Sequence, residues 1–150
     1  LQYAKGSKER DLLKAALEKV YATTLDIPMF IGAEEVRTGD TGSIRPPHAH
    51  QKVIANFHKG DKSHVEKAIS EALKAKENWE NMSWEHRAAI FLKAADLIAG
   101  KYRYDLNAAT MAGQSKNAYQ AEIDSACELI DFLRFNVKYM TEIYQQQPPV

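Results

Sequence analysis

The chain has 150 residues with an ordinary globular composition, 45% hydrophobic and 27% charged, and its twenty basic residues balance twenty acidic ones. This balance predicts no surface for nucleic acid or for an anionic membrane. We expect neither a membrane span nor a signal peptide, because no apolar run is long enough for the first and no suitable pattern opens the chain. The single cysteine, Cys127, excludes an internal disulfide and favours a reducing, intracellular compartment.

The first part of the chain predicts one helix followed by a small block of strands. Ser7 is a good capping residue for the helix, and Pro28 prevents helix further on. The segment after the predicted hairpin is rich in Gly, Pro, Thr and Ser, which is typical of a loop. The expected elements are a helix over Ser7–Tyr21, a hairpin of Met29–Ile31 and Glu35–Arg37 around a turn at Gly32–Glu34, a loop over Thr38–Gln51 and a strand over Val53–Phe57.

From Lys62 onward the apolar residues recur at helical spacing. The chain has neither an alternating series of strands and helices nor a G-x-G-x-x-G turn, so a doubly wound sheet is not expected. The predicted fold class is mainly α with a small block of hairpin and strand. The expected helices are Ser63–Asn81 with Ser63 as the cap, a helix from Ser83 to a stop at Gly100, Tyr102–Met111 with a break near Gly113, and Asn117–Tyr144 before Pro148 and Pro149.

The helix predicted over Asn117–Tyr144 has more apolar surface than one stripe. Cys127, Leu129 and Phe132 lie beside the main stripe. A helix that is apolar on several sides must be covered on several sides, and the rest of the chain offers few elements for this. We therefore expect the helix to lie inside a larger structure. Its main stripe is Tyr119, Ile123, Ala126, Ile130, Leu133, Val137, Met140 and Tyr144.

The same helix carries a row of carboxylates, Asp124, Glu128 and Asp131, at positions i, i+4 and i+7. Like charges at this spacing repel each other. One interpretation is a solvated or salt-bridged surface, with Arg134 and Lys138 relieving the repulsion. The other is that one carboxylate faces a cavity and attracts a cationic group of a ligand.

Other reactive side chains do not form a recognisable site. A nucleophilic cysteine needs a nearby cation, whereas carboxylates flank Cys127 in the sequence, so we interpret it as structural. His48 and His50 could hold a metal only on a strand, and two prolines just before them favour a loop. We predict no metal site there. Trp79 and Trp84 flank a turn between helices and are interpreted as packing residues.

Several stretches carry motifs that occur together in one family. Arg87–Ile98 and Val65–Trp79 are similar to consecutive helices in the N-terminal region of aldehyde dehydrogenases. Further motifs resemble the 1-pyrroline-5-carboxylate dehydrogenase branch of that family, and their order along the chain is more specific than any one of them. They are Met111–Lys116, Gln120–Asp124, Glu128–Phe132, Gly6–Arg10 and Gly32–Val36.

The resemblance implies oxidation of glutamate 5-semialdehyde, the open form of 1-pyrroline-5-carboxylate, to glutamate at the end of proline breakdown. NAD accepts the hydride, a cysteine thiolate forms the covalent intermediate, and a glutamate activates the hydrolytic water. It also implies a homo-oligomer in the bacterial cytoplasm or, in eukaryotes, in the mitochondrial matrix. Residues 1–150 would be the N-terminal helical segment of the α/β, NAD-binding half, not a complete domain.

Little of the family's machinery carries over to this chain. Cys127 lacks the Gly-Gln-x-Cys surroundings of the nucleophile, so no catalytic, NAD-binding or metal-binding residue is assigned. Glu128 corresponds to a glutamate whose helix borders the aldehyde pocket. A carboxylate there suits the α-ammonium of the substrate, so Glu128 is our candidate substrate-binding residue. Asp124 and Asp131 are assigned to structure.

Two interpretations without dehydrogenase activity remain open at this stage. The chain could be a helical interaction module that docks a partner helix through its carboxylate row or second apolar stripe. It could also be a metal-binding regulator that uses His48 and His50. A source polypeptide much longer than 150 residues favours the dehydrogenase.

The isolated chain is expected to be inactive, because the nucleophile and the cofactor site implied by the resemblance lie beyond Val150. The measurement is NADH formation by the purified chain with glutamate semialdehyde. Detectable reduction of NAD would contradict this prediction.

Overall fold

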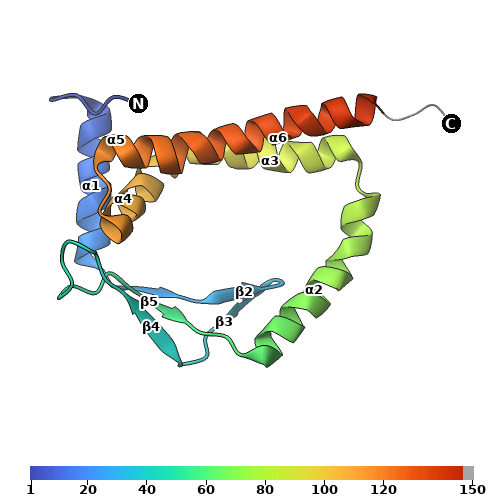
Figure 1. The fold of residues 1–150 in the computed structure, drawn as a ribbon, viewed down its shortest axis with the longest axis horizontal. Helices are drawn as coiled ribbons and strands as arrows, with labels where there is room; N and C mark the ends of the chain where they lie inside the picture. The colour runs from blue at the N-terminus through green and yellow to red at the C-terminus, as the bar shows by residue number, and fades with distance from the viewer. Residues whose placement is uncertain (147–150) are drawn as a thin grey trace.

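The computed structural model describes residues 1–146 and places the helices and strands in an open frame (Figure 1). The expected fold class, mainly helical with a small strand block, is confirmed. Pro148 and Pro149, expected to end the last helix, lie outside the described residues. The elements are α1 (Lys8–Ala22), β1 (Leu25–Ile27), β2 (Met29–Ile31), β3 (Glu34–Val36), β4 (Thr41–Ile44), β5 (Ala55–His58), α2 (Lys62–Asn81), α3 (Trp84–Ala99), α4 (Arg103–Gln114), α5 (Ala118–Ala121), the π-helical η1 (Glu122–Cys127) and α6 (Glu128–Gln145).

The strands form two small sheets. The expected hairpin is β2–β3, and β3 begins at Glu34 because Gly32, with a φ of 62°, and Ala33 complete the turn. In the other sheet β5 lies between β1, which is parallel to it, and β4, which is antiparallel. The prediction of a loop is wrong for β4. This strand has few apolar side chains, and its Gly42 leaves room for the ring of Phe57, so pairing with β5 defines it rather than its own pattern.

Side-chain caps decide where the helices begin. Ser7 caps α1 and Ser83 caps α3, as the sequence predicted. The prediction is wrong for α2, whose cap is Asp61 rather than Ser63. The Asp61 carboxylate accepts hydrogen bonds from the backbone N–H groups of Ser63 and His64, and the His64 ring accepts one from the Asp61 N–H. This reciprocal arrangement starts the helix earlier than a Ser63 cap would.

The helix stop at Gly100 is confirmed, whereas the break predicted near Gly113 is displaced. Helix α4 continues through Gln114, and the chain turns at Ser115, which adopts a left-handed φ of 58°. Residue Asn117 then caps the next helix through a hydrogen bond from the Gln120 N–H. The chain therefore reverses after the glycine rather than at it.

The last long helix is continuous over α5, η1 and α6 but is not α-helical throughout. In the π-helical η1 each backbone hydrogen bond spans one residue more than in an α-helix. This extra residue rotates the side chains after it by about 100°. The main apolar stripe predicted for this helix is therefore wrong at its start. Ala126 and Ile130 are buried, but Tyr119 is 71% and Ile123 39% exposed.

Two small clusters form much of the core within residues 1–146. Leu13 and Ala16 of α1 pack on Ala108 of α4, and Ala95 of α3 packs on Ala126 and Ile130 of the last helix. Small residues let the helix backbones approach closely, so each cluster is compact but contributes little apolar area.

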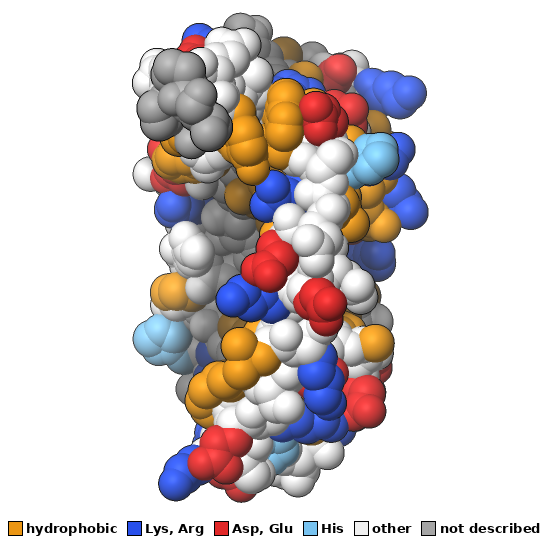
Figure 2. Space-filling view, turned by 90° about the vertical axis from the view of Figure 1, so that its right-hand side faces the viewer, with side chains coloured by type: hydrophobic (Ala, Val, Ile, Leu, Met, Phe, Trp, Pro, Cys, Tyr) orange, Lys and Arg blue, Asp and Glu red, His pale blue; other side chains and the backbone are white. Residues whose placement is uncertain are grey.

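Much of the apolar surface has no cover within residues 1–146. Helix α2 has no buried residue, although its apolar residues recur at helical spacing. In α3 the apolar residues Ala88 and Ala95 are buried, but Ile90 and Phe91 are exposed. Phe132 of α6 is 62% exposed. Figure 2, which looks at the side that carries α2, shows hydrophobic side chains open to solvent between charged ones. These faces agree with the expectation that the chain lacks elements to cover its helices.

We expect the chain to be poorly soluble when expressed by itself, because such open apolar surface promotes association. Gel filtration and binding of a hydrophobic dye measure this. Phe132→Ser and Phe135→Ser should reduce aggregation, whereas Leu13→Ser, in the core, should increase it. A sharp monomer peak without dye binding would show that the exposed faces are harmless.

Candidate functional site

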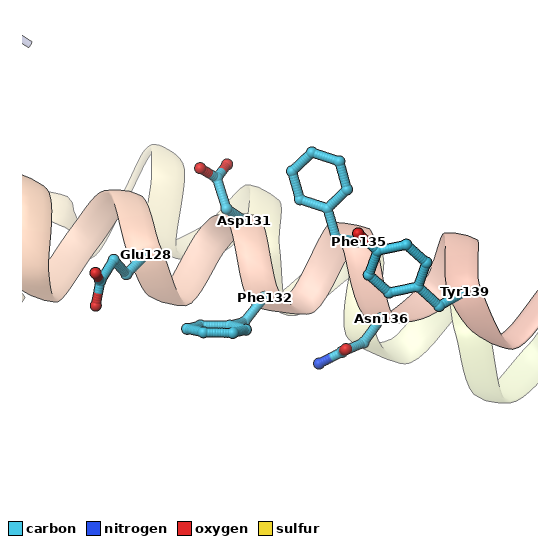
Figure 3. A pocket seen from close by; sticks show the side chains of 6 residues that line it. All are labelled: Glu128, Asp131, Phe132, Phe135, Asn136 and Tyr139. Carbon is cyan, nitrogen blue, oxygen red and sulfur yellow. The ribbon is translucent and has the colours of Figure 1, made fainter.

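Helix α6 carries a shallow hollow of about 260 Å³ on its outer surface. Figure 3 shows Glu128, Phe132 and Asn136 pointing to one side of the helix. Asp131 and Phe135 point to the other side, and Tyr139 projects between the two groups. The hollow therefore has a carboxylate on each flank and aromatic rings along its length. Its lining residues are Glu128, Asp131, Phe132, Phe135, Asn136 and Tyr139.

The charges of this hollow are not neutralised by the rest of the described chain. Within residues 1–146, the carboxylates of Glu128 and Asp131 make neither a hydrogen bond nor an ion pair. The rings of Phe135 and Tyr139 are stacked, with centroids 6.2 Å apart. Carboxylates attract a cation by charge, and aromatic faces attract it through their quadrupole. The hollow is thus suited to an ammonium group with an alkyl chain.

An apolar groove of about 360 Å³ adjoins this hollow, between α3 and α6. Phe132 and Asn136 border both spaces. A ligand could therefore place a charged group beside Glu128 and hydrocarbon in the groove. The groove is lined by Phe91, Leu129, Phe132, Leu133, Asn136, Val137 and Met140.

The predicted acidic row does not stay together. Asp124 forms an ion pair and belongs to the salt-bridged surface, while Glu128 and Asp131 border the hollow. The expected relief of the row by Arg134 and Lys138 is wrong, because both pair with other acids. Asp124 and Glu128 thus differ in their partners, because Lys116 neutralises the first whereas no basic side chain within residues 1–146 pairs with the second. The ion pairs are Lys116 Nζ–Asp124 Oδ2 at 2.7 Å, Arg134 Nη2–Asp96 Oδ1 at 3.0 Å and Lys138 Nζ–Glu142 Oε1 at 3.6 Å.

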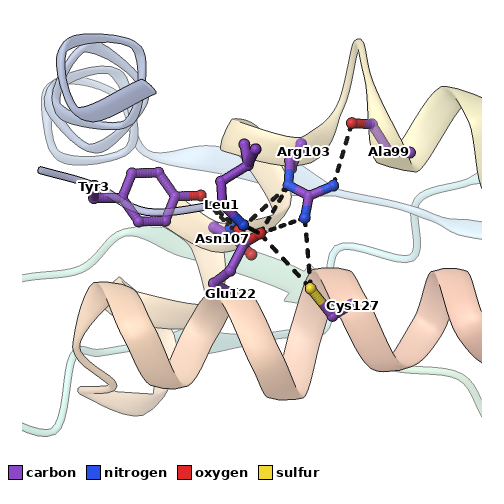
Figure 4. Close-up of polar contacts among 7 residues, drawn as sticks. All are labelled: Leu1, Tyr3, Ala99, Arg103, Asn107, Glu122 and Cys127. Carbon is purple, nitrogen blue, oxygen red and sulfur yellow. Dashed lines mark hydrogen bonds and ion pairs between the residues drawn. The ribbon is translucent and has the colours of Figure 1, made fainter. Parts of the chain in front are cut away.

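Sequence reasoning gave no role to Glu122, which is only 3% exposed and is the centre of a polar network (Figure 4). The Tyr3 hydroxyl donates to its Oε2 at 2.6 Å and Asn107 Nδ2 to the same atom at 2.8 Å. The Arg103 guanidinium donates to Oε1, with Nε at 3.1 Å, and the Leu1 amino nitrogen also contacts this oxygen. Nothing in the local sequence marks Glu122 as buried, because its partners come from distant segments.

The surroundings of Cys127 also differ from the sequence expectation. The thiol is half-buried, and the Nη2 of Arg103 lies 3.5 Å from its Sγ. Carboxylates alone were expected near it, but the fold brings this cation from α4 against it. Cys127 is therefore part of the Glu122 network rather than an isolated core residue.

The structure separates the two histidines weighed as metal ligands. The ring of His48 lies between Tyr21 Oη at 2.9 Å and Ser115 Oγ at 2.7 Å, whereas His50 contributes its carbonyl to Arg45. No group of three or more potential ligand side chains gathers within residues 1–146.

The tryptophans pack as expected. Trp79 meets Phe91 edge to face, with ring centroids 6.4 Å apart, and Trp84 stacks on Tyr144 with centroids 5.5 Å apart. These contacts fix the corner between α2 and α3 and the far end of α6.

None of the helices within residues 1–146 combines the length and the apolar character that a membrane span needs.

Comparison with known proteins identifies the family. Residues 36–150 match the aldehyde dehydrogenase family, and the chain belongs to it. The Delta-1-pyrroline-5-carboxylate dehydrogenase of Agaricus bisporus is 53% identical over 150 residues, covering 99% of this chain and 28% of that protein. The mitochondrial human protein of the same name is 46% identical over 148 residues, covering 99% of this chain and 26% of that protein. The resemblance inferred from the sequence is thereby confirmed.

The solved structures agree with these relatives. The crystal structure of the Delta-pyrroline-5-carboxylate dehydrogenase from Mycobacterium tuberculosis bound with NAD matches with a TM-score of 0.96 at 40% identity. The match covers 100% of this chain and 28% of that one. The chain therefore has the fold of the corresponding part of that enzyme and spans little more than a quarter of the relatives' length.

The network around Glu122 makes the protein sensitive to acid. Burial by itself raises the pKa of Glu122, but hydrogen bonds from Arg103, Tyr3 and Asn107 outweigh it and lower the pKa below its usual value of 4.5. When the pKa of a carboxyl is lower in the folded than in the unfolded state, the charged carboxylate stabilises the fold. The stabilisation is complete at a pH above the pKa of the unfolded state, and it is lost as the pH falls through the pKa of the folded state.

We predict that denaturant midpoints of the native protein fall between about pH 4.5 and pH 2, and that Glu122→Gln removes part of this dependence. At neutral pH the same substitution should cost about 3 kcal/mol, because it leaves the buried Arg103 unpaired. Unfolding curves over this pH range measure both effects. Asp124→Asn, at an exposed ion pair, is the matched control. Parallel pH profiles for native and Glu122→Gln proteins would contradict the assignment.

Proposed function

We propose that this chain is the N-terminal segment of a dehydrogenase that oxidises glutamate 5-semialdehyde to glutamate with NAD. The observation that carries this proposal is the close likeness, over the entire chain, to Delta-1-pyrroline-5-carboxylate dehydrogenases in sequence and in fold. The reaction transfers a hydride from the aldehyde carbon to NAD, and water supplies the new carboxylate oxygen. Residues 1–150 would contribute one wall of the active centre rather than its reacting groups.

Binding of NAD is assigned to the rest of the polypeptide. This chain has no Gly-rich turn of the kind that cradles a pyrophosphate, and α6 presents carboxylates rather than anion-binding groups at the hollow. The related Mycobacterium tuberculosis enzyme has been solved with NAD bound. The nucleophilic cysteine and the general-base glutamate are likewise assigned to residues beyond 150, so Cys127 has no catalytic role in this proposal.

Glu128 is the residue of this chain that we assign to the substrate. Its carboxylate is unpaired within residues 1–146, lies at an aromatic hollow and can accept a hydrogen bond from the α-ammonium of glutamate semialdehyde. Asp131, which the sequence assigned to structure, borders the same hollow. It points to the other side of the helix in Figure 3, which leaves Glu128 as the carboxylate on the Phe132 side.

The open faces of α2 and α6 support a role for this chain as part of a larger domain. We assign their cover to the remainder of the same polypeptide and, at the periphery, to further subunits of a homo-oligomer.

The human and Dictyostelium discoideum relatives are mitochondrial proteins by name, which supports a mitochondrial matrix location in a eukaryote; a bacterial source would imply the cytoplasm. A non-enzymatic interaction module would not account for a family match over residues 36–150.

Glu128→Ala in the full-length enzyme is expected to raise KM for glutamate semialdehyde about tenfold or more, because a charge-assisted hydrogen bond to the ammonium is lost. Steady-state kinetics with NAD in excess measure the change. Glu128→Gln tests the charge alone, and Asp124→Asn is the control for a carboxylate paired with Lys116. Unchanged KM and kcat in Glu128→Ala would remove Glu128 from the binding site.

A further inference from the structure

The π-helical segment η1 ends directly before Glu128, and a single side chain contacts both of its ends (Figure 4). Glu122 is the first residue of η1 and Cys127 is the last. The Arg103 guanidinium donates to the Glu122 carboxylate and lies 3.5 Å from the Cys127 Sγ. Arg103 therefore spans the whole segment from α4, on the side of the helix away from solvent.

Additional contacts fix this arrangement to the neighbouring helices. The Nη1 of Arg103 donates to the carbonyl of Ala99, the last residue of α3, at 3.3 Å. In the middle of η1 the hydroxyls of Thr110 and Ser125 are 2.9 Å apart. The segment is thus held at its start, middle and end by α4. A π-helical turn is rare in isolation, so these contacts explain why it persists here.

The turn has a direct consequence for Glu128. The extra residue rotates α6 by about 100° relative to α5, which precedes η1. In an uninterrupted α-helix Glu128 would therefore point to a different side of the helix relative to α5. In the structure Glu128 borders the aromatic hollow, whereas Asp124, within η1, pairs with Lys116. The direction in which Glu128 points depends on η1.

We propose that Arg103 and Glu122 are positioning residues, which hold η1 in its π-helical form and so aim the Glu128 carboxylate at the ammonium group of the substrate. This inference rests on the proposed role of Glu128. Neither Arg103 nor Glu122 lines the hollow, so both act through the backbone between residues 122 and 128. Loss of the contact between Arg103 and Glu122 should therefore impair recognition of the ammonium rather than the chemical step.

The test uses the full-length enzyme and two aldehydes that differ only in the ammonium. Glutamate 5-semialdehyde carries it, and 5-oxopentanoate has the same chain and carboxylate without it. In Glu122→Gln, KM for glutamate semialdehyde should rise about tenfold while KM for 5-oxopentanoate stays within about twofold, as expected when a binding group is misaligned. The kcat for both aldehydes should change little.

Arg103→Lys is the second variant and covers the case in which Glu122→Gln fails to fold. Lysine retains the charge that pairs with Glu122 but lacks the planar fork that reaches Cys127 as well. It should give the same selective rise in KM, of about threefold or more. The matched control is Arg134→Gln, which breaks the exposed pair between Arg134 of α6 and Asp96 of α3 and should leave both KM values unchanged.

The outcomes separate this inference from the proposed function. Glu128→Gln could impair only the ammonium-bearing aldehyde while Arg103→Lys changes neither KM. In that case Glu128 binds substrate, but Arg103 and Glu122 do not position Glu128. Equal increases in both KM values in Arg103→Lys would show general damage to the protein and would also contradict the positioning role of Arg103 and Glu122. If Glu128→Gln itself affects both aldehydes equally, the proposed role of Glu128 fails first.

Discussion

The carboxylate of Glu122 lies where distant parts of the chain meet. Tyr3 reaches it from the segment before α1, and Arg103 and Asn107 reach it from α4. A buried charge is costly unless it is paired and fully hydrogen-bonded, and this one has donors on both oxygens. The network therefore fixes α4 against η1 and, through η1, determines the direction of α6. These polar contacts hold the helices together where the buried apolar residues are mostly alanines, which have little apolar area.

The α-helical bundle around this network is compact, but the rest of the chain is not. Buried Ala95, Ala108 and Ala126 bring the helices close together, while large apolar residues remain on the outer faces of α2 and α6. Alanine contributes little buried area, so these contacts orient the helices more than they stabilise them. The relatives are almost four times as long as this chain. Under the proposed function, the rest of such a longer polypeptide covers this apolar surface.

A π-helical turn joins two parts of the last helix that pack against different neighbours. Before it, Ala118 packs beside Leu13 and Ala108 of α1 and α4; after it, Ile130 packs with Ala95 of α3. The turn shifts the side chains that follow it by about 100° compared with a regular α-helix, because it accommodates one extra residue. The same rotation sets the direction of α6 relative to α5, and with it the side of the helix on which Glu128 borders a hollow with aromatic rings.

By itself the sequence determined the helices, most of their caps, the hairpin and the family, because these depend on local periodicity, short-range hydrogen bonds and motif order. It also singled out Glu128, through the resemblance. The cap of α2 is also local, since Asp61 accepts hydrogen bonds from residues two and three positions on, although Ser63 was the residue predicted. Tertiary structure alone decided that β4 pairs with β5 and that η1 is π-helical. It also decided the burial of Glu122 and the approach of Arg103 to Cys127. These features arise from contacts between residues far apart in the chain, and such contacts leave no periodic signal in the local sequence.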